Sequence, residues 1–87
     1  MGLMTDGAVV VISKHARRQL EKRGLSEIDI AEALDKGEMI FSERNSRFGI
    51  KHHSKADFPN NKLVVVWFWN KKQEKEVVTV FWRKKKG

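Results

Sequence analysis

The sequence predicts one small α+β domain of 87 residues, in which a hairpin of two N-terminal helices packs on an antiparallel sheet of about four strands. Two segments within residues 13–37 have helical spacing, and each begins at a serine and ends at a glycine. From residue 39 onward the apolar residues recur with the period of a strand. The run Leu63–Trp69 is apolar at every position, so it predicts a central strand that is buried on both faces.

The helical segments carry their own start and stop signals. Ser13 can cap the first helix, and Gly24 suits the left-handed position that follows its last turn. Ser26 opens the second helix, and Asp29 three residues later completes a short capping box. We expect Gly37 to end the second helix as Gly24 ends the first. Because almost no loop separates the two helices, they predict a helical hairpin.

The strands and loops follow from periodicity and composition. A short edge strand is expected at residues 8–12, and further strands at residues 39–43, 46–51, 63–69 and 76–83. The segment HHSKADFPNN, residues 52–61, is polar and turn-forming, which predicts a loop. The whole chain, 1–87, is expected to form a single domain, with residues 1–7 and 84–87 disordered.

The composition excludes several classes of protein. The chain has no cysteine, so neither disulfides nor a thiolate metal site can stabilise it. Its longest apolar run is far shorter than the about 20 residues of a membrane-spanning helix. The N-terminal residues have no charged segment of the kind that begins a signal peptide. We therefore expect a soluble cytoplasmic protein, with no cofactor and no metal.

The positive charge is unevenly distributed. The net charge is +7 and the pI is about 10.0. Residues 13–25 carry a net +4, residues 26–38 a net −4, and residues 39–87 a net +8. A basic helix, an acidic helix and a basic half are typical of a protein that binds a polyanion. Nucleic acid is the expected partner, with RNA favoured over DNA; the alternative is a well-solvated surface.

His15 is the first candidate for chemistry. On a helix it shares a face with Arg18, Gln19 and Lys22. The cations can hold a phosphate while the imidazole, which titrates near neutrality, moves a proton. Cleavage of an RNA phosphodiester requires these parts. The alternative is a surface histidine on a basic helix.

Two further sets of polar residues are weaker candidates. His52, His53 and Asp57 lie in the expected loop, where one histidine could act as a second acid–base group or both could be incidental. Thr79 interrupts an apolar strand and is expected on the sheet face of Val77, Phe81 and Arg83. Its hydroxyl either lies at the rim of a binding site or belongs to an ordinary strand residue.

The aromatic residues cluster on two neighbouring strands. Five of them are candidates for the core: Trp67, Phe68, Trp69, Phe81 and Trp82. Two helices cover only one face of a sheet, so part of this set is expected to be exposed. An exposed aromatic surface among cations suits stacking of unpaired bases, and an oligomer interface would explain the same excess.

The order of these parts resembles a small bacterial family, domain of unknown function 4258. The resemblance spans residues 12–82 and rests on SKHARRQLEKRG, a short acidic helix ending in DKGE, and a terminal VVTVFW strand. Its most specific parts are His15-Ala16, Arg23-Gly24 and Val78-Thr79. This resemblance implies no assigned function.

A remoter resemblance is to the compact ribonucleases that include RelE-type toxins and colicin D-like tRNA nucleases. In the colicin D-like branch, a Lys-His-Ala at a helix start and a Thr on a late strand contribute to the site. Lys14, His15 and Thr79 match those positions, which implies that they face one RNA-binding surface as catalytic residues. The candidate nucleic-acid-binding residues around them are Arg18, Lys22, Arg23, Arg83, Arg44 and Arg47.

Three functions are therefore open. The first is a metal-independent endoribonuclease, the toxin of a toxin–antitoxin pair, with an acidic protein as its antitoxin. The second is a non-catalytic nucleic-acid-binding module that uses the same basic face. The third is a protein-interaction domain whose basic surface serves solubility.

Overall fold

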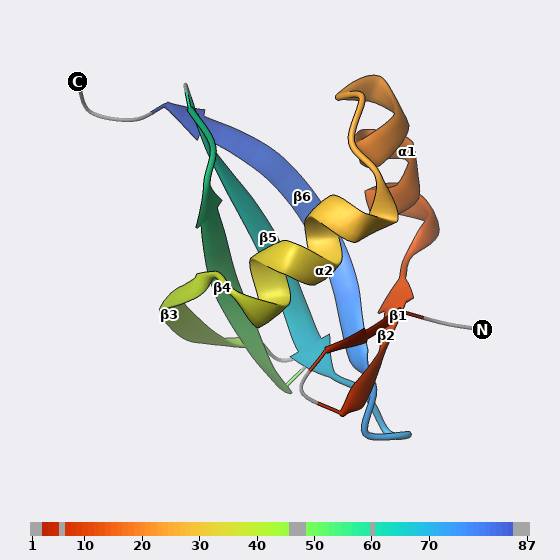
Figure 1. Cartoon of the computed structure of the whole chain (residues 1–87). Coiled ribbons are helices and arrows are strands. Elements are labelled where there is room, and N and C mark those ends of the chain that lie inside the picture. The colour runs from red at the N-terminus through yellow and green to blue at the C-terminus, as the bar shows by residue number, and fades with distance from the viewer. Residues whose placement is uncertain (1–2, 6, 46–48, 60, 85–87) are drawn as a thin grey trace.

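The computed structural model describes residues 3–5, 7–45, 49–59 and 61–84 and contains two helices and six strands in that part of the chain (Figure 1). In chain order these are β1 (Leu3–Thr5), β2 (Ala8–Ile12), α1 (Lys14–Lys22), α2 (Glu27–Asp35), β3 (Glu38–Asn45), β4 (Gly49–Asp57), β5 (Asn61–Trp69) and β6 (Lys75–Lys84). The α+β class is confirmed. The helices, however, follow β2 and are not strictly N-terminal.

The strands form one mixed sheet in the order β1-β2-β6-β5-β4-β3. Every neighbouring pair is antiparallel except β2 and β6, which run parallel. The segment at residues 8–12 is therefore an internal strand, and the prediction that it is an edge strand was wrong because β1 pairs along its outer side. The prediction of a central strand at residues 63–69 is confirmed, since β5 lies between β6 and β4.

The helix caps are those that the sequence predicts, with one exception. The hydroxyl of Ser13 accepts the amide of Ala16, and Ser26 and Asp29 form a complete capping box. Gly24 has the expected positive φ of 65°. Gly37 does not, and it is required for a different reason. A Cβ there would lie 2.1 Å from the carbonyl oxygen of Ala33 and 2.2 Å from that of Lys55, so only glycine allows β4 to approach the end of α2.

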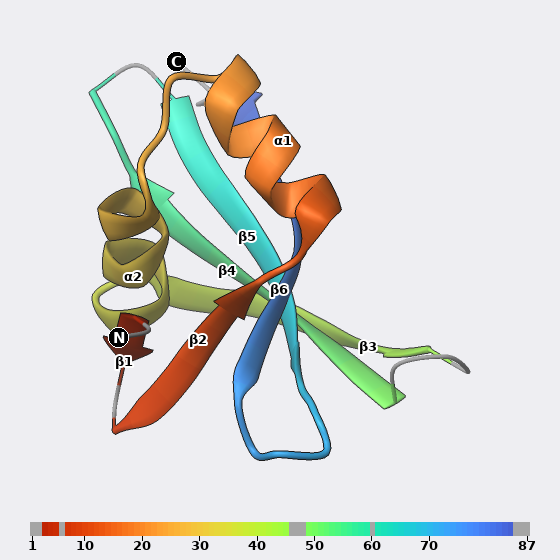
Figure 2. The same cartoon turned by 90° about the vertical axis from the view of Figure 1, so that its right-hand side faces the viewer.

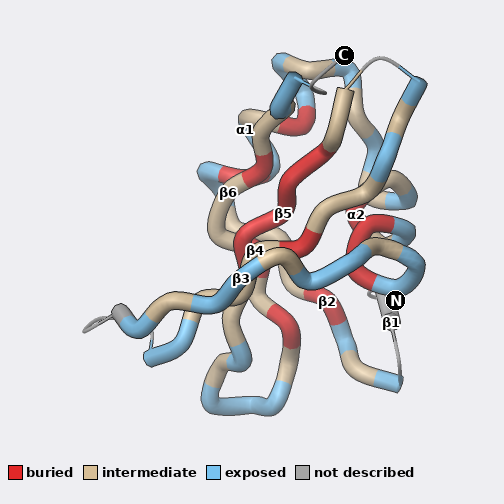
Figure 3. Tube along the Cα trace, turned by 90° about the vertical axis from the view of Figure 1, so that its left-hand side faces the viewer, coloured by how far each residue is buried: buried red, intermediate tan, exposed pale blue. Residues whose placement is uncertain are grey.

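The hydrophobic core lies between the helices and one face of the sheet (Figure 3). Small and branched side chains from α1 and α2 pack on β5 and β6, and the members contributed by these four elements are Ala16, Leu20, Ile30, Ala33, Leu34, Leu63, Val65, Trp67, Val77 and Val80. Both faces of β5 are nevertheless buried, because Val64 and Val66, which point away from the helices, are only 1% and 3% exposed. This burial on both faces explains the continuous apolar run.

Helix α1 continues along the side of β6 where β2 ends (Figure 2). Ser13 donates its amide to the carbonyl of Val77 and its hydroxyl to that of Val78. Farther along, the side-chain oxygen of Gln19 accepts the amide of Val80 at 2.9 Å. Beyond the end of β2, the side chain of Gln19 therefore supplies the hydrogen-bond acceptor that a neighbouring strand would give to β6.

Two predictions about the strands were wrong. Residues 52–57 belong to β4 and are not part of a loop, because their polar side chains have partners in the sheet. Trp67, for example, donates its indole N–H to the hydroxyl of Ser54 at 3.0 Å. The strand expected at residues 39–43 also ends too early, since β3 extends to Asn45.

The register of β6 corrects the expected face of Thr79. Val66 pairs with Thr79 but Trp67 pairs with Val77, so β6 carries an extra residue at this point. The bulge lets Val77 and Val80, which are three residues apart, both enter the core. Thr79 therefore does not share a face with Val77.

The expected disordered ends contain ordered residues, since Leu3–Thr5 form β1 and Lys84 ends β6. Residues 1, 2, 6 and 85–87 lie outside the described part, as does Arg47. Within the described residues, no helix has the length and apolar character needed to cross a membrane.

Candidate nucleic-acid interface

The sheet face turned away from α2 carries two of the candidate residues, Thr79 and Arg83, together with cations of β4 and β5. We call it the open face, and its members on the three adjacent strands β4, β5 and β6 are Lys51, His53, Lys55, Asp57, Lys62, Val64, Val66, Phe68, Glu76, Thr79, Phe81 and Arg83. The register places them in rows across the strands. Thr79, Val66 and His53 form one row, and Arg83, Lys62 and Asp57 form another. A row brings side chains from distant parts of the chain within contact distance.

A groove of about 680 Å³ lies at one end of the open face. Val64 lines it together with Ile40 and Asp57. Four cations also line it, from three different strands: Lys55, Lys62, Arg83 and Lys84. With one carboxylate against four cations, the groove has a positive potential that attracts an anionic chain.

The cations of the groove differ in their pairing. Lys55 lies 3.7 Å from a carboxylate oxygen of Glu38 and 3.8 Å from one of Asp57. Within the described part of the chain, no ion pair is formed by Lys62, Arg83 or Lys84. These three side chains can therefore meet a phosphate without first giving up a protein carboxylate.

His53 is held in a small cluster on the open face beside the groove. Its Nε2 lies 3.3 Å from Oε1 of Glu43, and its ring stacks on Phe41 with centroids 4.1 Å apart. The ammonium of Lys51 lies 3.5 Å from the same carboxylate oxygen. The hydrogen bond from His53, followed by the charge of Lys51, lowers the pKa of Glu43 below its ordinary value. The cluster therefore holds an anionic glutamate between the imidazole of His53 and the ammonium of Lys51.

His52 and His53 do not form a metal site. They are adjacent in β4, so their side chains lie on opposite faces of the sheet. His52 contacts Trp67 on the helix side, with ring centroids 4.7 Å apart, and burial lowers its pKa. The described residues contain no group of three histidines, cysteines or carboxylates placed to hold a metal ion.

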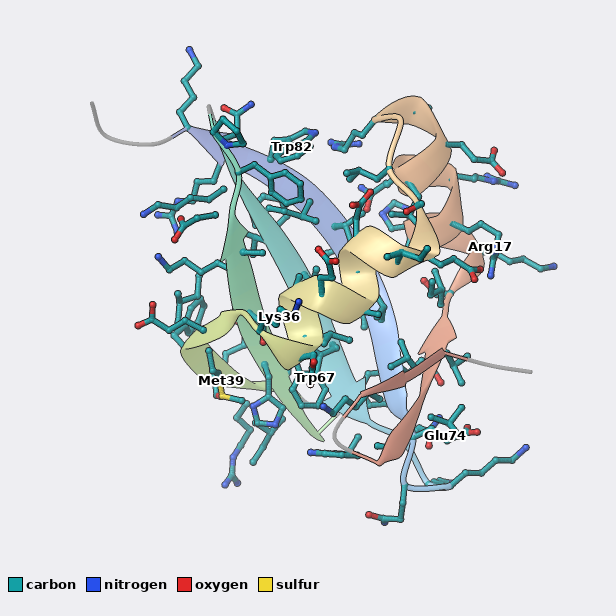
Figure 4. All side chains as sticks on the ribbon, in the orientation of Figure 1. Arg17, Lys36, Met39, Trp67, Glu74 and Trp82 are labelled. Carbon is teal, nitrogen blue, oxygen red and sulfur yellow. The ribbon has the colours of Figure 1, made fainter. Side chains whose placement is uncertain are left out.

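Helix α1 presents a second set of cations next to β6. Lys14, His15, Arg18 and Lys22 are all exposed, whereas Arg23 is half-buried. The neighbouring Arg17 is different, because its guanidinium pairs with Glu27 of α2 at 2.7 Å; Figure 4 labels it. These exposed side chains add positive charge beside β6, the strand that α1 contacts through Gln19.

The structure connects His15 and Thr79 indirectly. Gln19 lies one turn after His15, and its side-chain oxygen accepts the hydroxyl of Thr79. The Thr79 hydroxyl therefore has a partner within the fold, and it holds α1 against β6. Among the described residues His15 has no hydrogen bond or ion pair.

The remaining candidates are separated from this surface. Arg44 pairs in register with Ile50 and shares the sheet face of Ser42 and His52, away from the groove. The sequence pattern does not identify three of the groove residues, because Lys55 falls in the expected loop, Lys84 in the expected disordered tail, and Lys62 just before the strand expected at residues 63–69. The alternation of Lys51, His53, Lys55 and Asp57 at period two was the signal that identifies them as one strand face.

These features define a small α+β protein with a mixed sheet that is covered by helices on one face and cationic on the other. The chain belongs to the family described as Domain of unknown function (DUF4258), whose model matches residues 12–82. The match includes both helices and most of the groove, but neither Arg83 nor Lys84. No curated protein matches the chain, and no solved structure matches it.

Proposed function

We propose that this protein binds single-stranded RNA in the groove of the open face. The observation that carries the proposal is the convergence of Lys55, Lys62, Arg83 and Lys84 on one groove with a single carboxylate. Three strands supply these cations, so their proximity is a property of the sheet and not of a local run of charge. Phosphates tracked by such a row of cations contribute sequence-independent affinity.

Single strands fit this surface better than duplex DNA. Phe68 and Phe81 lie on the open face among the cations and are half-buried, and Phe41 on the adjoining β3 is 50% exposed. Aromatic rings beside cations on a sheet are a stacking surface for unpaired bases. Helix α1 lies along β6, and a major-groove reader would instead need a projecting helix.

RNA cleavage is the second candidate function, and one observation favours it. His15 is exposed beside Arg18 at the start of α1, and Gln19, one turn later, contacts Thr79. In this proposal His15 is the acid–base group, and Lys14 and Arg83 bind the scissile phosphate. The resemblance to RelE-type and colicin D-like ribonucleases supports the same assignment and suggests a toxin. An acidic antitoxin would then compete with RNA for the groove.

The test is RNA affinity measured at several salt concentrations for two matched double variants. Lys62→Ala with Arg83→Ala removes two cations from the groove. Lys71→Ala with Lys72→Ala removes two cations from the exposed turn between β5 and β6. We expect about tenfold weaker binding and a salt slope smaller by about 1.4 for the groove pair only.

Equal losses from the two double variants would contradict the groove as the binding site. The absence of RNA binding at physiological salt would leave an acidic protein partner as the explanation of the surface. Cleavage is tested in the same samples: a 2′,3′-cyclic phosphate product that disappears in His15→Ala and persists with chelator would establish the ribonuclease. Binding without product would assign the protein to the non-catalytic class.

A further inference from the structure

A second cavity lies on the opposite face of the sheet, beside the C-terminal end of α2. It has a volume of about 480 Å³, within the range of small-ligand sites. Figure 4 shows two of its residues, with Trp67 beside α2 and Met39 on the β3 side. We call this cavity the aromatic pocket, and the residues that give it its character are Asp35, Met39, His52, Trp67, Trp69 and Lys75.

The two tryptophans make a rigid corner. Their ring centroids are 5.5 Å apart and their planes meet at 81°. Trp67 is 5% exposed and is held by its hydrogen bond to Ser54 and by the ring of His52. Trp69 is 45% exposed, so one large aromatic surface remains open at the side of the cavity. Such a surface can stack the planar ring of any nucleobase.

Lys75 places a buried positive charge in the same corner. Its ammonium lies 5.2 Å from the centroid of Trp67 and 5.7 Å from that of Trp69, and the residue is only 4% exposed. The electron-rich faces of both rings stabilise this cation. A lysine ammonium offers three donors and no acceptor, so it favours a ligand that presents an acceptor atom.

Asp35 favours a ligand that presents a hydrogen-bond donor, whereas Lys75 favours an acceptor. Asp35 lines the cavity at the end of α2, where the helix dipole is also negative. An ionised carboxylate only accepts hydrogen bonds, and it disfavours a phosphate at this side. The pocket therefore fits a neutral planar ring whose edge combines an acceptor with a donor.

We propose that the aromatic pocket binds one unpaired nucleobase, stacked on Trp69, and prefers guanine and uracil to adenine and cytosine. Guanine and uracil have a carbonyl oxygen next to a ring N–H, which matches a lysine donor and a carboxylate acceptor. Adenine and cytosine present an amino group next to an unprotonated nitrogen, which reverses both contacts. The proposal rests on the proposed RNA binding for the origin of the base, and it would give that binding a sequence preference.

The experiment uses neutral nucleosides, so that the charged groove does not contribute. Uridine against cytidine and inosine against adenosine are two pairs that differ at this edge of the base. The three tryptophans give three indole N–H signals in a nitrogen–proton correlation spectrum. We expect uridine and inosine to shift the signals of Trp67 and Trp69 and to leave that of Trp82 in place. Their affinities should exceed those of cytidine and adenosine by at least about fivefold.

Two variants identify the pocket, and one matched variant controls for exposure. Trp69→Leu removes the stacking surface and should abolish the shift of Trp67. Lys75→Met keeps the length of the side chain without its charge and should remove the preference within each pair. Ile28→Ala, which shortens an exposed apolar side chain on α2 that lines neither the groove nor the aromatic pocket, should change neither result.

Equal affinities within both pairs of nucleosides would overturn the proposed preference. Shifts that survive in Trp69→Leu, or that include Trp82 to the same extent, would overturn the pocket itself. The Lys62→Ala, Arg83→Ala double variant separates this proposal from the proposed function. If that variant binds RNA normally while Trp69→Leu loses the nucleoside shifts, only the groove is wrong; the reverse pattern leaves only the pocket wrong.

Discussion

The two faces of the sheet use the same residue types in different ways. On the open face the cations of the groove surround the buried Val64, and three of them have no ion pair with a described residue. In the aromatic pocket the ammonium of Lys75 is buried against two indole rings. Exposed charges act at long range and are screened by salt, whereas a buried charge acts only on what enters its cavity.

The comparison shows how alternation in β4 separates two histidines that are neighbours in the chain. His52 lies against Trp67 and lines the aromatic pocket, while His53 joins Glu43 and Phe41 on the open face. One face combines charge and accessible area, which favours affinity for any polyanion. The face with the aromatic pocket combines rigid indole rings with the ammonium donor of Lys75, which favours selectivity among ligands.

The largest expected effect is the loss of Trp67, which belongs to both the core and the pocket. Trp67→Ala should lower the free energy of unfolding by about 3–5 kcal/mol, because it leaves a cavity and removes the partner of Ser54. Denaturant unfolding followed by circular dichroism measures this change. Trp69→Ala, two positions from the buried ring but half exposed, should cost much less; equal losses would show that Trp69 also supports the core.

The next effect comes from the contact between α2 and β4 that positions both surfaces. Gly37→Ala should lower the free energy of unfolding by about 2–3 kcal/mol, since the new Cβ meets two backbone carbonyl oxygens. Gly24→Ala is the matched control. Nothing lies within 4 Å of its added Cβ, and only its positive φ is strained, so about 1 kcal/mol is expected. A smaller loss for Gly37 than for Gly24 would contradict this close packing.

Salt should separate the two surfaces. Between 50 and 200 mM salt, binding of an RNA oligonucleotide to the groove should weaken by about 50-fold, the value for about four phosphate contacts on a single strand. Binding of uridine to the aromatic pocket should change by less than about twofold, because a neutral ligand releases no counterions. Titrations at both salt concentrations measure the two effects. A steep salt dependence of uridine binding would mean that the pocket does not act independently of the surface charge.

The smallest expected effect is the pH dependence that His52 contributes. Burial lowers the pKa of His52 below its ordinary value of 6.5, so the unfolded chain binds this proton more readily than the folded chain. The stability contributed by neutral His52 is therefore complete above pH 6.5 and decreases as the pH falls below it. Asp35 and Lys75 line the same cavity as His52.

Unfolding at pH 7.5 and pH 5.5 tests this dependence. His52→Gln should reduce the loss of stability between the two pH values relative to the unchanged chain. His15→Gln, an exposed histidine with no hydrogen bond or ion pair to a described residue, should not. An identical pH dependence in all three proteins would exclude His52 as the titrating group.

Local signals predicted much of the fold. Ser13, Ser26 and Gly24 mark helix ends through hydrogen bonds and backbone angles that depend on nearby residues. The apolar run at residues 63–69 likewise identified an internal strand. The loop predicted at residues 52–61 was wrong because polar composition cannot show that Ser54 has a buried indole as its partner.

The candidate site was only partly accessible to sequence reasoning. The sequence pointed to the cations of α1 and to Arg83, since their charge is visible without a structure. Lys62 and Lys55 were missed because only the pairing of β4 with β5 and of β5 with β6 brings them together. The sheet face of Thr79 was also predicted wrongly. Alternation along the sequence does not give the face of a residue once a bulge adds an extra residue to the strand.

The sequence by itself determined the class of fold, the helix ends, the internal strand and the uneven positive charge. These depend on short-range periodicity and on composition, which the chain carries before it folds. The tertiary structure decided which cations share a groove, which histidine lies on which face, and that Lys75 is buried between two tryptophans. Those outcomes depend on strand order and register, which arise from contacts between residues far apart in the chain.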